Sequence, residues 1–127
     1  MENSEQNTEK QNKFKPFSFK GRIGKKTYRK VVYICTIAIA LMLILMWIGS
    51  MLDNDIYIND PVSIIIVVVV FAVAVIAAWI SWASAAKRFH DLGHSGRRIF
   101  FLPFGWFSLF SKDGEPGDNE YGPNPKE

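Results

Sequence analysis

The stretch KRFHDLGHSGRR, residues 87–98, gathers the side chains of this chain that are best suited to chemistry. Two histidines, His90 and His94, lie four residues apart with Asp91 between them. On a helix such a pair shares one face, which is how the motif H-E-x-x-H binds zinc. Asp91 takes the place of the glutamate base on a shorter side chain, and the sequence indicates no third ligand. One interpretation is therefore a metal-dependent enzyme with His90, Asp91 and His94 as candidate ligands.

Gly93 favours a different interpretation of the same stretch. A glycine here is typical of a helix end, where it adopts the left-handed conformation, and residues 94–96 would form the following turn. Lys87 and Arg88 would complement the negative end of the helix dipole, whereas Asp91 is unfavourable there and needs a cationic partner. We therefore predict a charged joint at a membrane surface, with no catalytic residue, metal or other cofactor.

Two long runs without any charge determine the predicted fold class. Residues 31–52 and 62–86 each exceed the roughly 20 residues that a helix needs to cross a bilayer. The second run is rich in β-branched residues, but ordinary strands end after about 4–8 residues, and an isolated strand in lipid leaves its backbone unpaired. We predict an all-α integral membrane protein built on a two-helix transmembrane hairpin.

The first run differs from a secretory signal peptide. A signal peptide has an apolar region of about 7–15 residues behind a short basic stretch. Here thirty mostly polar residues precede a 22-residue run that lacks a clear cleavage site. We interpret this run as a retained anchor, and the single cysteine, Cys35, lies inside it.

The distribution of charge predicts the orientation of the hairpin. Residues 1–30 contain nine Lys and Arg against three Glu, whereas residues 53–60 contain three Asp and no basic residue. Four basic residues follow the second run: Lys87, Arg88, Arg97 and Arg98. Because short loops rich in Lys and Arg stay in the cytoplasm, both termini should be cytoplasmic. The net charge of +3 is too small to indicate nucleic acid as a partner.

The segments that flank the hairpin predict contact with lipid. Residues 13–30 alternate phenylalanines with lysines, a pattern that suits an anionic membrane surface and also occurs in single-strand nucleic-acid binders. Lipid is the simpler partner because a membrane anchor follows directly. Residues 99–110 are aromatic but too short to span, and Pro103 and Gly105 should interrupt any helix. We predict an interfacial or re-entrant segment, with a strongly tilted third crossing as the alternative.

These patterns divide the chain into eight segments. The expected segments are a disordered tail (1–12), a basic and aromatic interfacial segment (13–30), the first transmembrane helix (31–52), an acidic external loop (53–61), the second transmembrane helix (62–86), a cytoplasmic-face motif (87–98), an interfacial or re-entrant segment (99–110) and an irregular cytoplasmic tail (111–127).

Three stretches resemble the signatures of the domain of unknown function 805 family, small bacterial inner-membrane proteins. They are FKGRIGKKTY, KRFHDLGHSG and GDNEYGPNP, and the resemblance covers about residues 14–125. The chain differs where Arg97 and Arg98 replace an aromatic pair and the following apolar span is shorter. The resemblance implies a bacterial inner membrane and no settled activity. The matching residues, which we take as a structural or interaction motif, are Phe19, Gly21, Arg22, Arg88, His90, Asp91, Gly93, Ser95 and Gly96.

Arg22 is the cation that we expect to pair with Asp91. It precedes the first helix on the same membrane face, and a guanidinium group can hold a carboxylate through two hydrogen bonds. Lys87 and Arg88 are closer in sequence, but their side chains can also extend toward lipid phosphates. Gly21 and Gly93 would permit the close turns that this pairing needs.

The function predicted from the sequence is non-catalytic: an envelope or adaptor protein that acts through lipid or protein contacts. Its expected partners are anionic lipid headgroups at the inner face and a membrane protein or second copy of the chain. Two alternatives stay open, the metal-dependent enzyme and a transporter subunit. A transporter would need an intramembrane charge, which neither apolar run contains.

Overall fold

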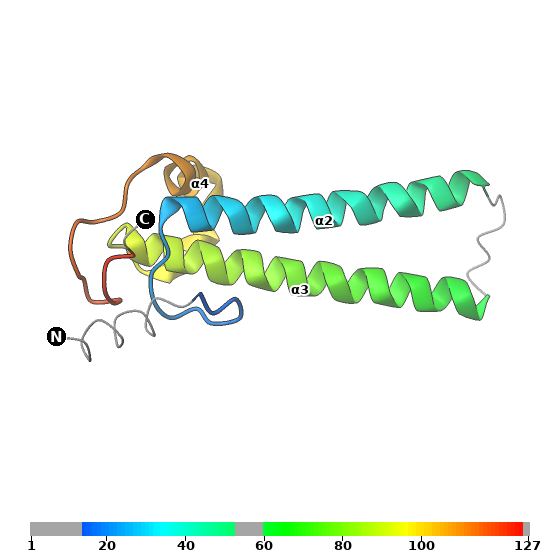
Figure 1. The fold of residues 1–127 in the computed structure, drawn as a ribbon, viewed down its shortest axis with the longest axis horizontal. Helices are drawn as coiled ribbons and strands as arrows, with labels where there is room; N and C mark the ends of the chain where they lie inside the picture. Colours follow the sequence, from blue (N-terminus) through cyan, green and yellow to red (C-terminus); the bar gives the residue numbers. More distant parts are fainter. Residues whose placement is uncertain (1–13, 53–59, 126–127) are drawn as a thin grey trace, which may run out of the picture.

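Two long helices lie side by side and end in a compact cluster of shorter segments (Figure 1). The computed structural model describes residues 14–52 and 60–125. Its helices are α2 (Lys25–Leu52), α3 (Pro61–Asp91), the 3-10 helix η1 (Gly96–Phe101) and α4 (Leu102–Ser111). Within these ranges there is no strand, only an isolated bridge between Asn119 and Gly122. The predicted all-α fold class is confirmed.

Helices α2 and α3 are long and apolar enough to cross a membrane. At 1.5 Å per residue, their 28 and 31 residues give lengths of about 42 and 47 Å, against about 30 Å of hydrocarbon. Only 6 % of the apolar window of each helix is buried inside the molecule. A core helix of a soluble protein would be mostly buried, so the exposed apolar surface favours a hairpin surrounded by lipid.

Both ends of α3 carry a local signal. At its start the Asp60 side chain accepts a hydrogen bond from the Ser63 amide at 3.0 Å, and proline occupies the first helical position. At its end Gly93 has a φ of +70°. The Gly93 amide donates to the His90 carbonyl at 3.1 Å, and the His94 amide donates to that of Phe89 at 2.9 Å. This is a Schellman motif, and the predicted helix end at Gly93 is confirmed.

The helices extend beyond the charge-free runs. Helix α2 begins at Lys25, where the Tyr28 amide donates to the Gly24 carbonyl at 3.0 Å, and α3 continues to Asp91. A charge-free run predicts only the part of a helix that can lie in hydrocarbon. It does not predict polar turns that continue the same helix beyond the membrane. These additional turns carry charged residues into the cluster at one end of the hairpin.

The third apolar segment forms η1 and α4 rather than a long helix. Helix α4 has ten residues and is about 15 Å long, too short to span a bilayer. In Figure 1 it lies beside the start of α2. The expected interruption at Pro103 and Gly105 is wrong, because α4 contains both. Pro103 is tolerated because it lies in the first turn, where backbone N–H groups have no helical acceptor.

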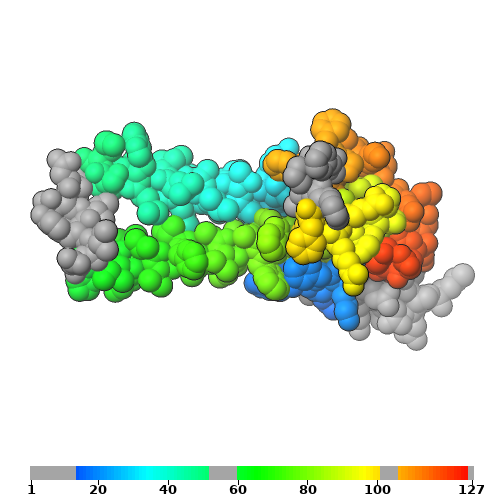
Figure 2. Space-filling view, turned by 180° about the vertical axis from the view of Figure 1, so that it is seen from behind, coloured from blue at the N-terminus to red at the C-terminus, as the bar shows by residue number. Residues whose placement is uncertain are grey.

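We call the cluster at this end of the hairpin the head. It comprises residues 14–24, the last turns of α3 from Ala85, η1, α4 and residues 112–125. Figure 2 shows it as wider than the pair of helices that leads into it. Its apolar core joins these parts, except residues 112–125, to the first turns of α2. The buried core residues are Ile23, Tyr28, Ala85, Phe89 and Leu109.

Candidate functional site

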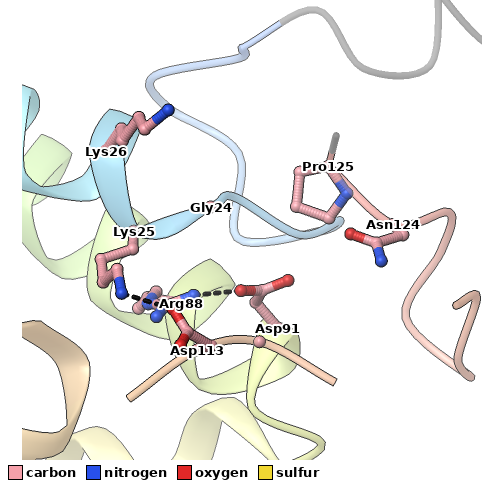
Figure 3. Close-up of a pocket in the computed structure, with 9 residues that line it drawn as sticks. Gly24, Lys25, Lys26, Arg88, Asp91, Asp113, Asn124 and Pro125 are labelled. Atoms are coloured by element: carbon pink, nitrogen blue, oxygen red, sulfur yellow. Dashed lines mark hydrogen bonds and ion pairs between the residues drawn. The ribbon is translucent and has the colours of Figure 1, made fainter. Parts of the chain in front are cut away.

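Asp91 lies at the centre of the head, between two arginines. Its carboxylate is 3 % exposed, and its Oδ1 accepts hydrogen bonds from Arg22 Nε at 3.1 Å and Nη2 at 3.0 Å. Its Oδ2 accepts from Arg88 Nη1, a pair drawn in Figure 3. The predicted pairing of Arg22 with Asp91 is confirmed. We refer to Arg22, Asp91 and Arg88 as the brace.

Arg22 also holds the C-terminal part of the head. Its Nη2 donates to the Glu115 carbonyl at 2.9 Å, and its Nη1 donates to the carbonyls of Gly117 at 2.8 Å and Gly122 at 3.4 Å. A guanidinium group presents its donors in a fixed plane, so one side chain can satisfy acceptors from several segments at once. Arg22 thereby connects the segment before α2, the end of α3 and residues 115–122.

Arg88 is fully buried rather than placed at the membrane surface. Its Nε donates to the Leu109 carbonyl at 3.1 Å and its Nη2 to the Lys112 carbonyl. Lys87 is also buried, and its Nζ donates to the Lys15 carbonyl at 2.6 Å. The expectation that these two cations extend toward lipid is therefore wrong. Both side chains bind backbone carbonyls of the neighbouring segments instead.

Two glycines allow the C-terminal segment to approach the brace. A Cβ atom on Gly114 would lie 2.2 Å from Asp91 Oδ2, and one on Gly93 would lie 2.0 Å from Glu115 Oε1. Such distances are impossible for a side chain without movement of its neighbours. The Glu115 amide also donates a hydrogen bond to the Asp91 carbonyl at 2.8 Å, which joins the C-terminal segment to the end of α3. Glycine is thus required at Gly114, because the Asp91 carboxylate is held in place by two arginines, whereas at Gly93 the neighbour is the flexible end of the Glu115 side chain and the positive φ is what favours glycine.

His90 contacts both the segment before α2 and the segment after α4. Its Nδ1 lies 3.1 Å from the Gly21 carbonyl, and because a carbonyl only accepts, Nδ1 carries the proton. Its ring stacks on Tyr121 at a centroid distance of 4.1 Å and an interplanar angle of 2°. Asn119 Nδ2 donates to the His90 carbonyl at 3.0 Å. His90 therefore binds the first and last segments of the head to α3.

The predicted metal-ligand geometry does not form. Helix α3 ends at Asp91, so His94 lies beyond the Gly93 turn instead of one helical turn from His90. The Asp91 carboxylate is engaged by the brace. Across residues 14–52 and 60–125, no three His, Cys, Asp or Glu side chains gather where they could hold a metal ion.

A cavity of about 420 Å³ opens beside the brace (Figure 3). It is lined at the start of α2 by Lys25 and Lys26 and opposite them by Asp113. Lys25 Nζ binds Asp113 Oδ1, and this hydrogen bond holds the pKa of Asp113 below its usual value. The Asp113 side chain is largely exposed, so the ion pair is solvated and contributes little to stability.

The sequence profile of the family described as protein of unknown function (DUF805) matches residues 16–123. The chain belongs to the DUF805 family. No curated protein and no solved structure matches it. The match therefore gives the extent of the domain without assigning an activity.

Most of the residues that carry the resemblance to DUF805 meet around α3. Arg22, Arg88 and Asp91 form the brace, whereas Phe19 packs edge-on against Trp79 at 5.3 Å, away from these charges. The remaining predicted residues shape the turns and their surroundings. Gly21 accepts from His90, Gly93 ends α3, Ser95 Oγ accepts from the Arg97 amide, and Gly96 lies against His90.

The sequence reasoning missed four residues of this DUF805 head. Gly114 and Glu115 approach the end of α3, and Asn119 and Tyr121 contact His90. Asn119 and Tyr121 belong to GDNEYGPNP, the third stretch that resembles the family, and that stretch was a usable signal. Gly114 and Glu115 carry no such signal because their role depends on backbone position.

Proposed function

We propose that this protein is a non-catalytic adaptor of a bacterial inner membrane, which presents its head to a protein partner in the cytoplasm. The observation that carries the proposal is the brace. Its charged groups bind one another and the backbone carbonyls of five head residues, Leu109, Lys112, Glu115, Gly117 and Gly122. Buried charges used in this way stabilise a defined surface, and they are poorly placed to react with a substrate.

The shape of the molecule supports an adaptor. The hairpin exposes apolar side chains along most of its length, while the buried charged side chains lie in the head or at its edge. Residues 112–125 run across the outside of the head and include several exposed polar residues, among them Asp118 and Glu120. Among the described residues, the head is the polar surface with which an anchored protein could bind a soluble partner.

Charge supports the cytoplasmic position proposed for the head. The described part of the head contains Lys15, Lys20 and Arg97 among its exposed cations. Segments rich in Lys and Arg remain on the cytoplasmic side of a bilayer. Residues 53–59, which carry acidic residues of the opposite loop, lie outside the described residues.

In vivo photocrosslinking tests the adaptor function. A photoreactive residue at Asp118, which is exposed on the head, should give a discrete adduct with a protein. The same residue at Ile65, which is exposed on the apolar surface of α3, serves as the control and should give lipid adducts. The Asp118 adduct should disappear when Asp91→Ala removes the brace.

The alternatives predict other results. The metal-dependent enzyme predicts no protein adduct from the head. It also predicts about one tightly held metal ion per purified chain, which His90→Ala and His94→Ala should each remove. A transporter subunit would give its adducts from the membrane-spanning surface, at Ile65, and with another integral protein. Either pattern contradicts the adaptor.

Thiol labelling tests the proposed orientation. In a Cys35→Ala background, Asn59→Cys should react with a membrane-impermeant reagent in intact cells, whereas Ser4→Cys and Lys126→Cys should react only after lysis. Reaction of Ser4→Cys in intact cells contradicts the orientation. Reaction of Lys126→Cys alone would mean that the chain crosses the membrane a third time.

A further inference from the structure

A groove of about 520 Å³ lies on the head beside the final turns of α3. One wall is a single face of α3, from Trp79 and Trp82 to His90. The facing wall comes from η1, which includes Phe100, and from Phe19 of the segment before α2. In Figure 2 the yellow residues of η1 adjoin the end of α3, with the blue segment before α2 next to them.

The groove is largely apolar, and its few polar lining residues come from the end of α3 and the turn after it. Trp79 and Trp82 are 49 % and 56 % exposed. His90 lies eleven residues further along α3, about 17 Å away. Ser95 and Arg97 line the groove after the turn that follows α3. The groove therefore has two tryptophan rings along α3 and a serine and an arginine beyond the end of that helix.

The turn after α3 closes the groove against the helix. A Cβ atom on Gly96 would lie 3.0 Å from His90 Nε2 and 3.3 Å from the Ala86 Cβ. A side chain here would require His90 and Ala86 to shift by a few tenths of an ångström. The position of Arg97 is fixed by its sequence neighbour Gly96 and by the Arg97 amide, which donates to Ser95 Oγ at 3.4 Å.

We propose that this groove binds one anionic phospholipid, with its phosphate at Arg97 and an acyl chain along Trp79 and Trp82. The proposal rests on the membrane placement in the proposed function. Charge complementarity supports it, because Arg97 is the cation among the described lining residues and none of them is acidic. Tryptophan rings favour the headgroup level of a bilayer, where phosphates and the first methylene groups meet.

A phospholipid fits this groove better than a free anion. A small anion would use Arg97 alone and make no contact with the exposed rings of Trp82 and Phe100. A phospholipid joins a phosphate, which would lie at Arg97, to an apolar chain, which would lie along Trp79 and Trp82. Exposed apolar surface next to a cation at the end of a spanning helix is typical of a lipid contact.

Native mass spectrometry of the full-length protein in detergent micelles tests the groove. With added phosphatidylglycerol, the wild type should retain one lipid molecule per chain, and phosphatidylcholine should be retained much less. Arg97→Ala should weaken binding of phosphatidylglycerol by about fivefold or more, the effect of about 1 kcal/mol per cation at a lipid surface. Arg98→Ala is the matched control, because Arg98 is an adjacent exposed cation that does not line the groove, and it should bind as the wild type does.

A second pair of variants tests the tryptophan rings. Trp82→Leu should weaken lipid retention, whereas Trp47→Leu, at an exposed ring on α2 outside the groove, should leave it unchanged. Equal losses in Arg97→Ala and Arg98→Ala would mean diffuse attraction and overturn the groove. Equal retention of phosphatidylcholine, or no retained lipid, also overturns it.

Failure of the groove is distinguishable from failure of the proposed function. If lipid is not retained but the Asp118 photoadduct persists, the groove is wrong and the adaptor stands. If alkaline carbonate extracts the chain from membranes, the membrane placement is wrong and both proposals are overturned. Selective retention that depends on Arg97 and Trp82 supports the groove.

Discussion

Removal of one side chain of the brace should destabilise the head strongly. Asp91→Ala abolishes three hydrogen bonds and leaves two guanidinium groups, of Arg22 and Arg88, without their carboxylate. All three side chains are at most 3 % exposed, so water compensates little. Breaking a buried ion pair costs about 3–5 kcal/mol, and we expect Asp91→Ala near the upper end because two charges lose their partner.

Arg22→Ala should cost less than Asp91→Ala. It leaves Asp91 paired with Arg88, so the remaining charges are balanced. The loss comes from two hydrogen bonds to Asp91 and from three carbonyl acceptors in residues 115–122. We expect about 3 kcal/mol, since hydrogen bonds to charged groups contribute about 1.5–3 kcal/mol each and part of the loss is recovered by water.

A double-mutant cycle isolates the contact between Arg22 and Asp91. The double variant should be less destabilised than the sum of the single variants by about 1–3 kcal/mol, measured as free energies of unfolding in detergent micelles titrated with dodecyl sulfate. Lys20 provides the control, since it is an exposed cation of the same segment. Lys20→Ala and Asp91→Ala should be additive to within about 0.5 kcal/mol. Additive losses for Arg22 and Asp91 would refute the brace.

Two further predictions concern the C-terminal part of the head. Gly114→Ala should destabilise the protein by about 1–3 kcal/mol, because its methyl group would overlap the Asp91 carboxylate, whereas Gly49→Ala, with open space around it in α2, should be neutral or stabilising; equal effects on the unfolding midpoint would contradict this packing. The lowered pKa of Asp113 implies stabilisation that is present above the unfolded pKa, near 4, and is lost as the pH falls through the folded value. Asp113→Asn should therefore have a slightly lower Tm than wild type at pH 7, and the two Tm values should converge toward pH 2; a constant difference would contradict the ion pair.

The sequence predicts those features that depend on side-chain type and local order. Long runs without charge predict the two spanning helices, because hydrocarbon excludes charge over a fixed length. Gly93 predicts the end of α3 because the left-handed conformation favours glycine. The pairing of Arg22 with Asp91 can be predicted because Asp91 lies at the negative end of a helix dipole and needs a cation, and Arg22 lies on the same membrane face.

Features that depend on backbone acceptors could not be predicted. Arg88 and Lys87 are adjacent cations, and only the rotation of α3 decides that Arg88 meets the carbonyls of Leu109 and Lys112. Carbonyl groups are the same in every residue, so no residue type marks them as acceptors. For the same reason, the composition of residues 111–127 predicts an irregular tail but not that its backbone carbonyls hold Arg22.

The contacts of Arg22 also have a consequence for the order of folding during synthesis. Its acceptors at Gly117 and Gly122 lie 95 and 100 residues further along the chain, and Asp91 lies 69 residues away. A ribosome must therefore translate both spanning helices and nearly the whole described chain before Arg22 can meet its last acceptor. Contacts between such distant segments form late, because closing a long loop is entropically unfavourable. The hairpin should accordingly insert first and the head should close afterwards, so that chains interrupted before residue 115 reach the membrane with an arginine and an aspartate still exposed at its surface.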